Sequence, residues 1–213
     1  MLFRDRVDAG EQLVPRLKQY ANQAEVIVLG LPRGGVVTAA AVAMALKLPL
    51  DIIVPRKIGA PMNEELALGA VAEEGAVMLD ERLTSLLGVS REYLDATVEK
   101  ERVEAARRLH KYRGNRPPLN LNGKTAIIVD DGVATGATMR AAIASAKAKG
   151  ARRVIAATPV IAPDTLVQLQ READEVVYLE APSYFSAVGQ FYEKFEQTED
   201  EQVVALLHKI KKI

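Results

Sequence analysis

The sequence predicts an α/β fold in which a parallel sheet of about five strands is flanked by helices. Short apolar runs rich in β-branched residues alternate along the chain with helical patterns, as parallel strands alternate with their crossover helices. Two of these runs lead directly into glycine-containing loops. Such loops lie at the carboxyl ends of parallel strands, where α/β proteins bind their ligands.

Composition limits the classes of protein that need to be considered. The 213 residues suffice for one well-buried domain, 1–213, but not for two full domains. Lys and Arg number 28, as do Asp and Glu, so no net charge favours nucleic acid or an anionic membrane as a partner. Cysteine is absent, which excludes disulfides and thiolate metal sites. The charged N-terminus lacks a signal-peptide core, and no apolar stretch could span a bilayer, so we expect a cytoplasmic protein.

The N-terminal part is predicted to contain two strands, with a loop after the first that could hold an anion. Its predicted elements are a helix over 8–20, a strand over 26–29, a helix over 36–48 and a strand over 50–54. Pro15 is placed in a first helical turn. The loop at 30–35 combines glycines with Arg33, whose guanidinium can bind phosphate oxygens in a bidentate way.

The segment after the second strand is predicted to be mostly irregular. Residues 55–65 contain two prolines, a glycine and several charges, which predicts an exposed loop. Residues 66–72 and 76–79 are predicted to pair as a short hairpin across a turn at 73–75.

A helical insertion is predicted over about 80–118. It contains a short helix over 81–87 and a long helix that Ser90 caps and that ends near residue 113. The basic stretch at 100–116 could touch nucleic acid, but a solvated helix or a subunit interface is favoured.

The most informative stretch begins with an apolar strand at 126–129. Asp130 and Asp131 follow it, and a loop of glycines and threonines at 132–138 leads into a helix that runs to Gly150. Backbone N–H groups and the positive end of the helix dipole would make this loop an anion site. Carboxylates beside a phosphate site suit the hydroxyls of a sugar phosphate. The alternative is an ordinary strand-to-helix turn with an Asp cap.

The C-terminal part completes the predicted sheet and adds a cluster of aromatic residues. The predicted elements are strands over 152–158 and 175–179, a helix over 163–171 between them, and a final helix preceded by a capping box at 198–201. The aromatic residues at 181–192 would either pack in a small core or stack on a flat ligand.

The stretch at 126–138 resembles the signature of the type I phosphoribosyltransferases, and the chain as a whole resembles their stand-alone predicted group. These enzymes bind 5-phosphoribosyl-1-pyrophosphate (PRPP). The resemblance implies their fold, with a small hood over 181–213, and it implies that Asp130 and Asp131 hold the ribose hydroxyls. The residues implied for ribose and 5′-phosphate binding beside this pair are Gly132, Val133, Ala134, Thr135, Gly136, Ala137 and Thr138.

The resemblance also assigns the pyrophosphate and the metal. Arg33, Gly34 and Gly35 resemble the pyrophosphate loop of xanthine-guanine enzymes, which often contains a non-proline cis peptide. Arg56 and Lys57 resemble the start of the mobile catalytic loop of adenine enzymes, with Lys57 also on the pyrophosphate; the alternative is solvated loop charge. Mg²⁺ would meet Asp130 and Asp131 directly or through water.

The identity of the acceptor stays open. The base would lie near the hood, where Tyr184, Phe185 and Phe191 are the candidates for binding it, with core packing as the alternative. Ala134 stands where 6-oxopurine enzymes usually carry a carboxylate, as it does in adenine enzymes.

The expected function is therefore Mg²⁺-dependent phosphoribosyl transfer from PRPP to a nitrogenous acceptor, a nucleobase in the first instance, with release of pyrophosphate. Arg56, Lys57, Asp130 and Asp131 would be the catalytic residues, in a homo-oligomer expected to be a dimer. One alternative is a non-catalytic PRPP or nucleotide sensor on the same fold. Another is a flavodoxin-like phosphate-binding module, which does not explain the acidic pair.

Overall fold

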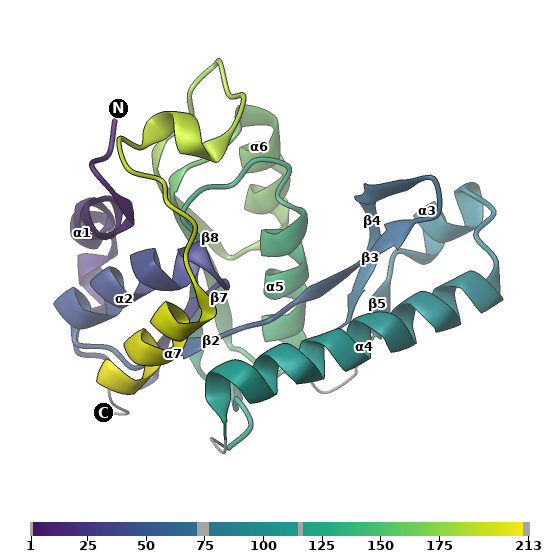
Figure 1. The fold of residues 1–213 in the computed structure, drawn as a ribbon, viewed down its shortest axis with the longest axis horizontal. Helices are drawn as coiled ribbons and strands as arrows, with labels where there is room; N and C mark the ends of the chain where they lie inside the picture. Colours follow the sequence, from purple (N-terminus) through teal and green to yellow (C-terminus); the bar gives the residue numbers. More distant parts are fainter. Residues whose placement is uncertain (1, 72–76, 115–116, 211–213) are drawn as a thin grey trace.

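The computed structural model describes residues 2–71, 77–114 and 117–210 and is organised around a five-stranded parallel sheet (Figure 1). The strand order is β2-β1-β6-β7-β8, which confirms the predicted α/β class. The strands are β1 (Val26–Gly30), β2 (Leu50–Ile52), β6 (Thr125–Val129), β7 (Arg153–Val160) and β8 (Glu175–Glu180). The neighbours β1 and β6 are buried along their whole length, because helices cover both faces of the sheet.

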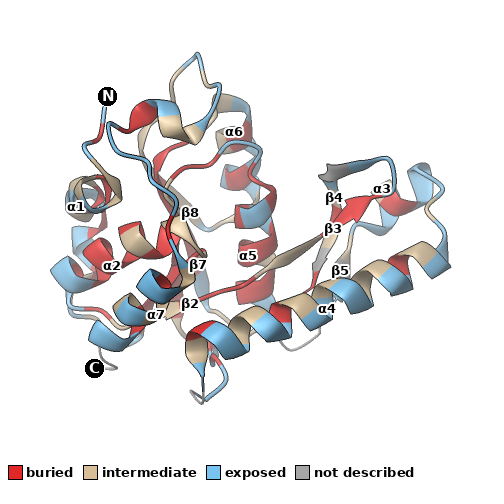
Figure 2. Ribbon diagram, viewed as in Figure 1, coloured by how far each residue is buried: buried red, intermediate tan, exposed pale blue. Residues whose placement is uncertain are grey.

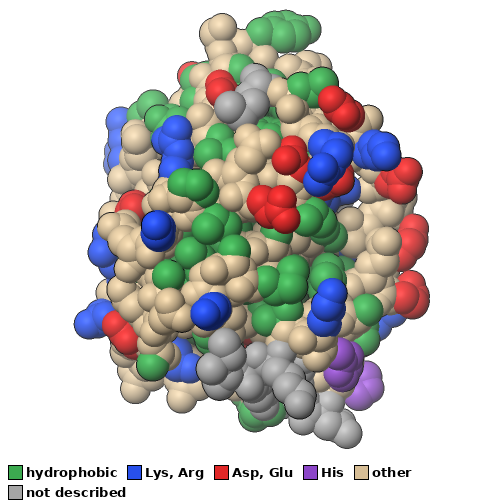
Figure 3. Space-filling model, turned by 90° about the vertical axis from the view of Figure 1, so that its left-hand side faces the viewer, with side chains coloured by type: hydrophobic (Ala, Val, Ile, Leu, Met, Phe, Trp, Pro, Cys, Tyr) green, Lys and Arg blue, Asp and Glu red, His purple; other side chains and the backbone are tan. Residues whose placement is uncertain are grey.

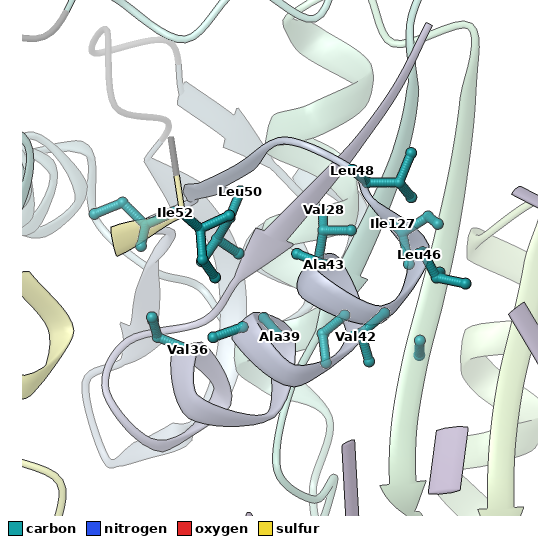
Figure 4. Close-up of a cluster of buried hydrophobic side chains, with 14 of the residues drawn as sticks. Val28, Val36, Ala39, Val42, Ala43, Leu46, Leu48, Leu50, Ile52 and Ile127 are labelled. Carbon is teal, nitrogen blue, oxygen red and sulfur yellow. The ribbon is translucent and has the colours of Figure 1, made fainter. Parts of the chain in front are cut away.

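Helices form a layer on each face of this sheet. One layer holds α1 (Arg6–Leu17), α2 (Gly34–Leu46) and α7 (Asp200–Lys209), and the other holds α5 (Ala137–Ala148) and α6 (Pro163–Glu172). Alternate strand residues serve the two layers: Val28 and Ile127 pack against α2, as Figure 4 shows, whereas Ile128 packs on the side of α5. Figure 2 shows the buried residues concentrated between these layers.

The register of the two neighbouring strands β1 and β6 determines where their loops meet. Gly30, the last residue of β1, pairs with Val129, the last residue of β6. The Leu31 N–H donates to the Val129 carbonyl at 3.0 Å just beyond that pair. The loops that follow the two strands therefore leave the sheet side by side.

A second unit, which we call the arm, spans 56–113 and extends away from the central sheet (Figure 1). Its antiparallel sheet has the order β3-β4-β5. The elements are β3 (Arg56–Ala60), β4 (Asn63–Val71), β5 (Val77–Leu79), α3 (Glu81–Leu86) and α4 (Arg91–Arg113). A small core of Ile58, Leu68, Val71 and Leu94 joins the sheet of the arm to α4.

The exposed loop predicted for 55–65 is wrong. The segment forms β3 and the start of β4, and Ile58 and Ala60 are buried. Pro55 and Pro61 flank β3 instead of interrupting it, so the ladder loses no donor within the strand. The predicted hairpin is confirmed in the pairing of β4 with β5, and its turn at 73–75 lies outside the described residues.

Two local predictions near helix ends also need correction. Asp5 caps α1 through the N–H groups of Val7 and Asp8, so the helix begins early and Pro15 lies near its C-terminal end instead of in a first turn. The box that starts α7 is shifted by one residue, since the Glu199 N–H donates to the Gln202 side chain at 2.9 Å. Ser90 caps α4 as predicted.

The segment after β8 returns across the carboxyl end of the sheet and includes a short 3-10 helix, η2 (Val188–Phe191). It is joined to the N-terminus, because the Phe3 N–H donates to the Phe191 carbonyl at 2.8 Å. A shorter 3-10 turn, η1 (Lys18–Tyr20), continues α1. Figure 3 shows side chains of both charge signs scattered over one face of the molecule. Among the described helices, none combines the length and the apolar character needed to cross a bilayer.

Candidate active site

The two glycine-containing loops form one site, because Gly34 and Gly35 lie against the acidic pair. A Cβ atom placed on Gly34 would be 2.1 Å from Oδ2 of Asp131, and one placed on Gly35 would be 2.7 Å from Oδ1 of Asp130. No side chain fits at either position unless the acidic pair moves. The sequence predicted anion-binding loops after two strands, and the structure brings these two loops into contact, with glycine as the only residue small enough for it.

Asp131 is fixed by a residue that the sequence did not single out. Its Oδ2 accepts a hydrogen bond from Nε of Arg6 at 2.6 Å, and the two side chains are only 13% and 12% exposed. Arg6 also donates from Nη1 to the Glu196 carbonyl at 2.6 Å, and its guanidinium lies 3.9 Å from the ring centre of Phe195. The Tyr192 hydroxyl donates to the Asp131 carbonyl at 2.5 Å. Asp131 is therefore a charge-paired acceptor in a fixed position.

The environment of Asp130 disfavours a negative charge, unlike that of Asp131, which is paired with Arg6. Its Oδ1 accepts a hydrogen bond from the Asp131 N–H at 2.9 Å. Burial, followed by the charge of Asp131, raises the pKa of Asp130 well above its usual range. A hydroxyl donor or a cation beside this carboxylate would favour its ionised form, so the pair is suited to a ligand that brings one of these groups.

Replacement of Asp130 by Asn should stabilise the ligand-free protein near pH 7, because burial and the charge of Asp131 raise the pKa of Asp130. With a folded-state pKa above the unfolded value of about 3.9, the folded protein binds more protons over that interval, so its stability falls as pH rises. Asn removes this penalty and can still accept the hydrogen bond from the Asp131 N–H.

The measurement is denaturant unfolding of both proteins from pH 5 to pH 8. The difference between them isolates Asp130, because the pKa of Asp200, lowered chiefly by Lys111, works in the opposite direction in both. An Asn variant that is less stable than the wild type at pH 7 would contradict the prediction.

The loop at 132–136 is held by a backbone hydrogen bond to β7 and by a side-chain hydrogen bond from α6. The Val133 N–H donates to the Val160 carbonyl at 2.9 Å, and the Thr165 hydroxyl donates to the Ala134 carbonyl at 2.6 Å. Gly136 has φ +75°, a conformation that favours glycine, and no side chain caps the N-terminus of α5. Because the N-cap Gly136 has no side chain to accept from the first N–H groups of α5, this helix start suits an anion, and the phosphate site expected there stays a prediction. Thr135 and Thr138 are exposed at this loop, and Ala137 begins the helix.

Arg33 belongs to the same site but is held toward α7. The Pro32–Arg33 peptide is cis, which confirms the expectation drawn from the resemblance. Nη1 of Arg33 lies 3.9 Å from both Oε2 of Glu199 and Oδ1 of Asp200 at the start of α7. Asp200 also accepts hydrogen bonds from Lys111 and from the Tyr112 hydroxyl, each at 2.5 Å.

Arg56 and Lys57 lie on β3 instead of on a loop. Both line a cleft of about 480 Å³ that also reaches Pro32 and Thr138, at the edges of the two glycine loops. Nε of Arg56 donates to Oε2 of Glu101 in α4 at 2.5 Å. The structure thus brings Arg56 and Lys57 to the border of the site, whereas Arg33 and the acidic pair do not line this cleft.

The aromatic candidates separate into two groups. Phe191 is 7% exposed and packs with Phe3 and Tyr192, and Phe185 lies 5.2 Å from it between ring centres. This favours the packing alternative for Phe191. Tyr184, in contrast, is 77% exposed. The aromatic side chains in contact with Asp131 or its partner Arg6 are those of Tyr192 and Phe195.

The carboxylates present fit a magnesium ion that arrives with a phosphate ligand. Over the described parts of the chain, no three His, Asp or Glu residues are grouped as a dedicated metal site. Asp130 and Asp131 are adjacent, and Mg²⁺ commonly binds one or two carboxylates while taking its other ligands from phosphates and water.

Comparison of the amino-acid sequence with known proteins identifies a family whose model covers most of the chain. The sequence model described as "Phosphoribosyl transferase domain" matches residues 4–196. Proteins of two Mycobacterium tuberculosis strains, named "Putative phosphoribosyl transferase MT0597" and "Putative phosphoribosyl transferase Rv0571c", are each 46% identical over 206 residues, which is 97% of this chain. The chain spans about half, 46%, of the length of these curated relatives.

Comparison with solved structures shows that the fold is shared. The crystal structure of TT1426 from Thermus thermophilus is 42% identical and superposes with a TM-score of 0.89, covering 99% of each chain. The purine phosphoribosyltransferase from Pyrococcus horikoshii Ot3 is 19% identical, with a TM-score of 0.50 over 93% of this chain and 97% of its own. At that identity the second likeness shows the shared fold alone.

Proposed function

The chain belongs to the phosphoribosyl transferase family, and on this premise we propose that it transfers the phosphoribosyl group of PRPP to a nitrogenous acceptor, a nucleobase in the first instance, and releases pyrophosphate. The observation that carries the proposal is the contact between Gly34–Gly35 and the Asp130–Asp131 pair, directly beside the uncapped N-terminus of α5. One ligand that bears a 5′-phosphate, ribose hydroxyls and a pyrophosphate would meet all three features at once.

Each part of PRPP has a chemically matched partner in this arrangement. The N–H groups at the start of α5 and the loop at 132–136 suit the 5′-phosphate. The carboxylates of Asp130 and Asp131 suit the ribose hydroxyls, which donate hydrogen bonds to them. The pyrophosphate would lie at the loop of Arg33, Gly34 and Gly35, where the contact of the two glycines with the acidic pair brings this loop next to the ribose site.

Catalysis would rest on positioning and on the stabilisation of charge. As the bond from the anomeric carbon to pyrophosphate lengthens, positive charge develops on the ribose and negative charge on the leaving group. In this proposal the carboxylates of Asp130 and Asp131 would stabilise the first. Lys57, which lines the cleft that reaches both glycine loops, would stabilise the second. Mg²⁺, held by Asp130 or Asp131 directly or through water, would supply further charge neutralisation on the phosphate oxygens. No nucleophile from the protein is needed.

The proposal is tested with PRPP, Mg²⁺ and a panel of purines, pyrimidines and small amines, with release of pyrophosphate as the readout. We expect release that depends on both Mg²⁺ and one member of the panel, and a new nucleotide detectable by mass spectrometry. A parallel reaction with EDTA controls for the metal. Sedimentation of the same preparation tests the proposed homodimer.

The alternative proposal is a sensor that binds PRPP or a nucleotide without turnover. The sensor proposal would be supported if PRPP bound saturably in calorimetry while no acceptor of the panel caused release of pyrophosphate. Absence of both binding and release would reject the two proposals together.

A further inference from the structure

The cleft of about 480 Å³ between β3 and α4 contains cationic residues, beyond Lys57, that the proposed reaction does not use. Four cationic side chains line it: Arg56 and Lys57 from β3, and Lys100 and Arg108 from α4. Glu101 is the only carboxylate among the described residues of its lining. Such an excess of cations predicts an anionic occupant.

The carboxylate in the cleft is already engaged. Oε2 of Glu101 accepts a hydrogen bond from Nε of Arg56 at 2.5 Å, and the two side chains are 12% and 24% exposed. Glu101 therefore offsets Arg56 and fixes its guanidinium. Arg108 is paired as well, with Glu104, which lies outside the lining. Even so, the four cations of the lining outnumber these two carboxylates, so the cleft keeps an excess of positively charged side chains.

The lining offers little aromatic surface on which a flat base could stack. Among the described lining residues the only aromatic side chain is Tyr93, and its hydroxyl donates to the Gly59 carbonyl at 3.1 Å. Thr97 lies one helical turn farther along α4.

The position of the cleft, beside the loop at 31–35, favours a diphosphate group as the bound anion. It is bounded by Leu31 and Pro32, which begin the loop next to the acidic pair, and by Thr138 in the first turn of α5. A diphosphate bound at the loop at 31–35, beside the acidic pair, would border this cleft, because Leu31 and Pro32 belong to both. We infer that α4 contributes Lys100 and Arg108 to a site for the diphosphate group of the substrate, an inference that rests on the proposed function.

Neighbouring arginines of α4 provide a matched pair for the test. Nε of Arg107 and Nε of Arg108 donate to the same residue, Glu104, at 2.7 and 2.8 Å, yet only Arg108 lines the cleft. Changing either arginine to glutamine removes the same charge and the same type of partner. A structural effect on α4 would therefore appear in both variants, whereas a loss of diphosphate binding would appear only in one.

The experiment is calorimetric titration with inorganic pyrophosphate plus Mg²⁺ and, separately, with ribose 5-phosphate. Arg108→Gln and Lys100→Gln should each weaken pyrophosphate about tenfold, as expected for one lost charge-assisted contact, and should leave ribose 5-phosphate within about twofold. Arg107→Gln should leave the affinities for pyrophosphate and for ribose 5-phosphate unchanged. PRPP should compete with pyrophosphate for the wild-type protein.

Three results would overturn the inference: equal pyrophosphate affinity in the Arg107, Arg108 and Lys100 variants, equal losses for both ligands, or simultaneous binding of PRPP and pyrophosphate, which would place the anion in a separate site. Any of these results would reject the inference alone if the wild-type protein still bound PRPP and released pyrophosphate, because the proposed function would then still be supported. A wild-type protein that binds pyrophosphate in the cleft but never PRPP would instead reject the function.

Discussion

Replacement of Lys57 by alanine should lower turnover about 100- to 1,000-fold while PRPP affinity falls only about twofold to fivefold. An ammonium group that stabilises the departing pyrophosphate acts mainly on the transition state, in which negative charge has accumulated. Lys57 lines the cleft that reaches both glycine loops, a position from which its ammonium group could stabilise the departing pyrophosphate. The measurement is the rate of pyrophosphate release under single-turnover conditions, together with PRPP binding by calorimetry.

Lys18 offers the control, since it is exposed in η1 and lies outside the site, and its alanine variant should behave as the wild type. Arg56 is a weaker choice for the same test. Its removal would leave the Glu101 carboxylate, 12% exposed, without its guanidinium, and stability would change with activity. If Lys57→Ala lost PRPP affinity and rate in equal proportion, Lys57 would be a ground-state contact instead of a transition-state one.

The second large effect concerns Asp131, whose replacement by Asn should weaken PRPP binding about 10- to 100-fold and lower stability together. The binding loss follows from the charge that strengthens hydrogen bonds from the ribose hydroxyls. The stability loss, about 2–3 kcal/mol, follows from the guanidinium of Arg6, which is 12% exposed and would lose its ionised partner at 2.6 Å. From the sequence alone, the fold of this variant would be expected to be unaffected, because Arg6 gives no sign of its role there.

A double variant separates the two effects. In Arg6→Gln/Asp131→Asn the unpaired charge is gone, so more than half of the lost stability should return in denaturant unfolding, whereas PRPP binding should stay weak. Arg4→Gln is the matched control, because Arg4 is 61% exposed and pairs with Asp5 at the surface. Recovery of PRPP affinity in the double variant would show that Asp131 acts through stability and not on the ribose.

The sequence predicted the secondary structure of the central sheet better than that of the arm. The strands of the central sheet were predicted closely, because each is a contiguous apolar run and burial on both faces leaves that pattern in the sequence. The arm was predicted poorly. Its strand β3 has only five residues, between Pro55 and Pro61, and it depends on pairing with β4 and on packing under Leu94.

By itself, the sequence determined the parallel sheet, the acidic pair and the glycine- and threonine-containing loop after β6, since the residues that form each of these are neighbours along the chain. Only the tertiary structure decided that Gly34 and Gly35 lie on that acidic pair and that Arg6 neutralises Asp131 from 125 residues away. It also decided that α4 brings Lys100 and Arg108 to the cleft beside β3. These contacts depend on strand register and on the packing of distant segments, which leave no local periodicity from which the sequence could have predicted them.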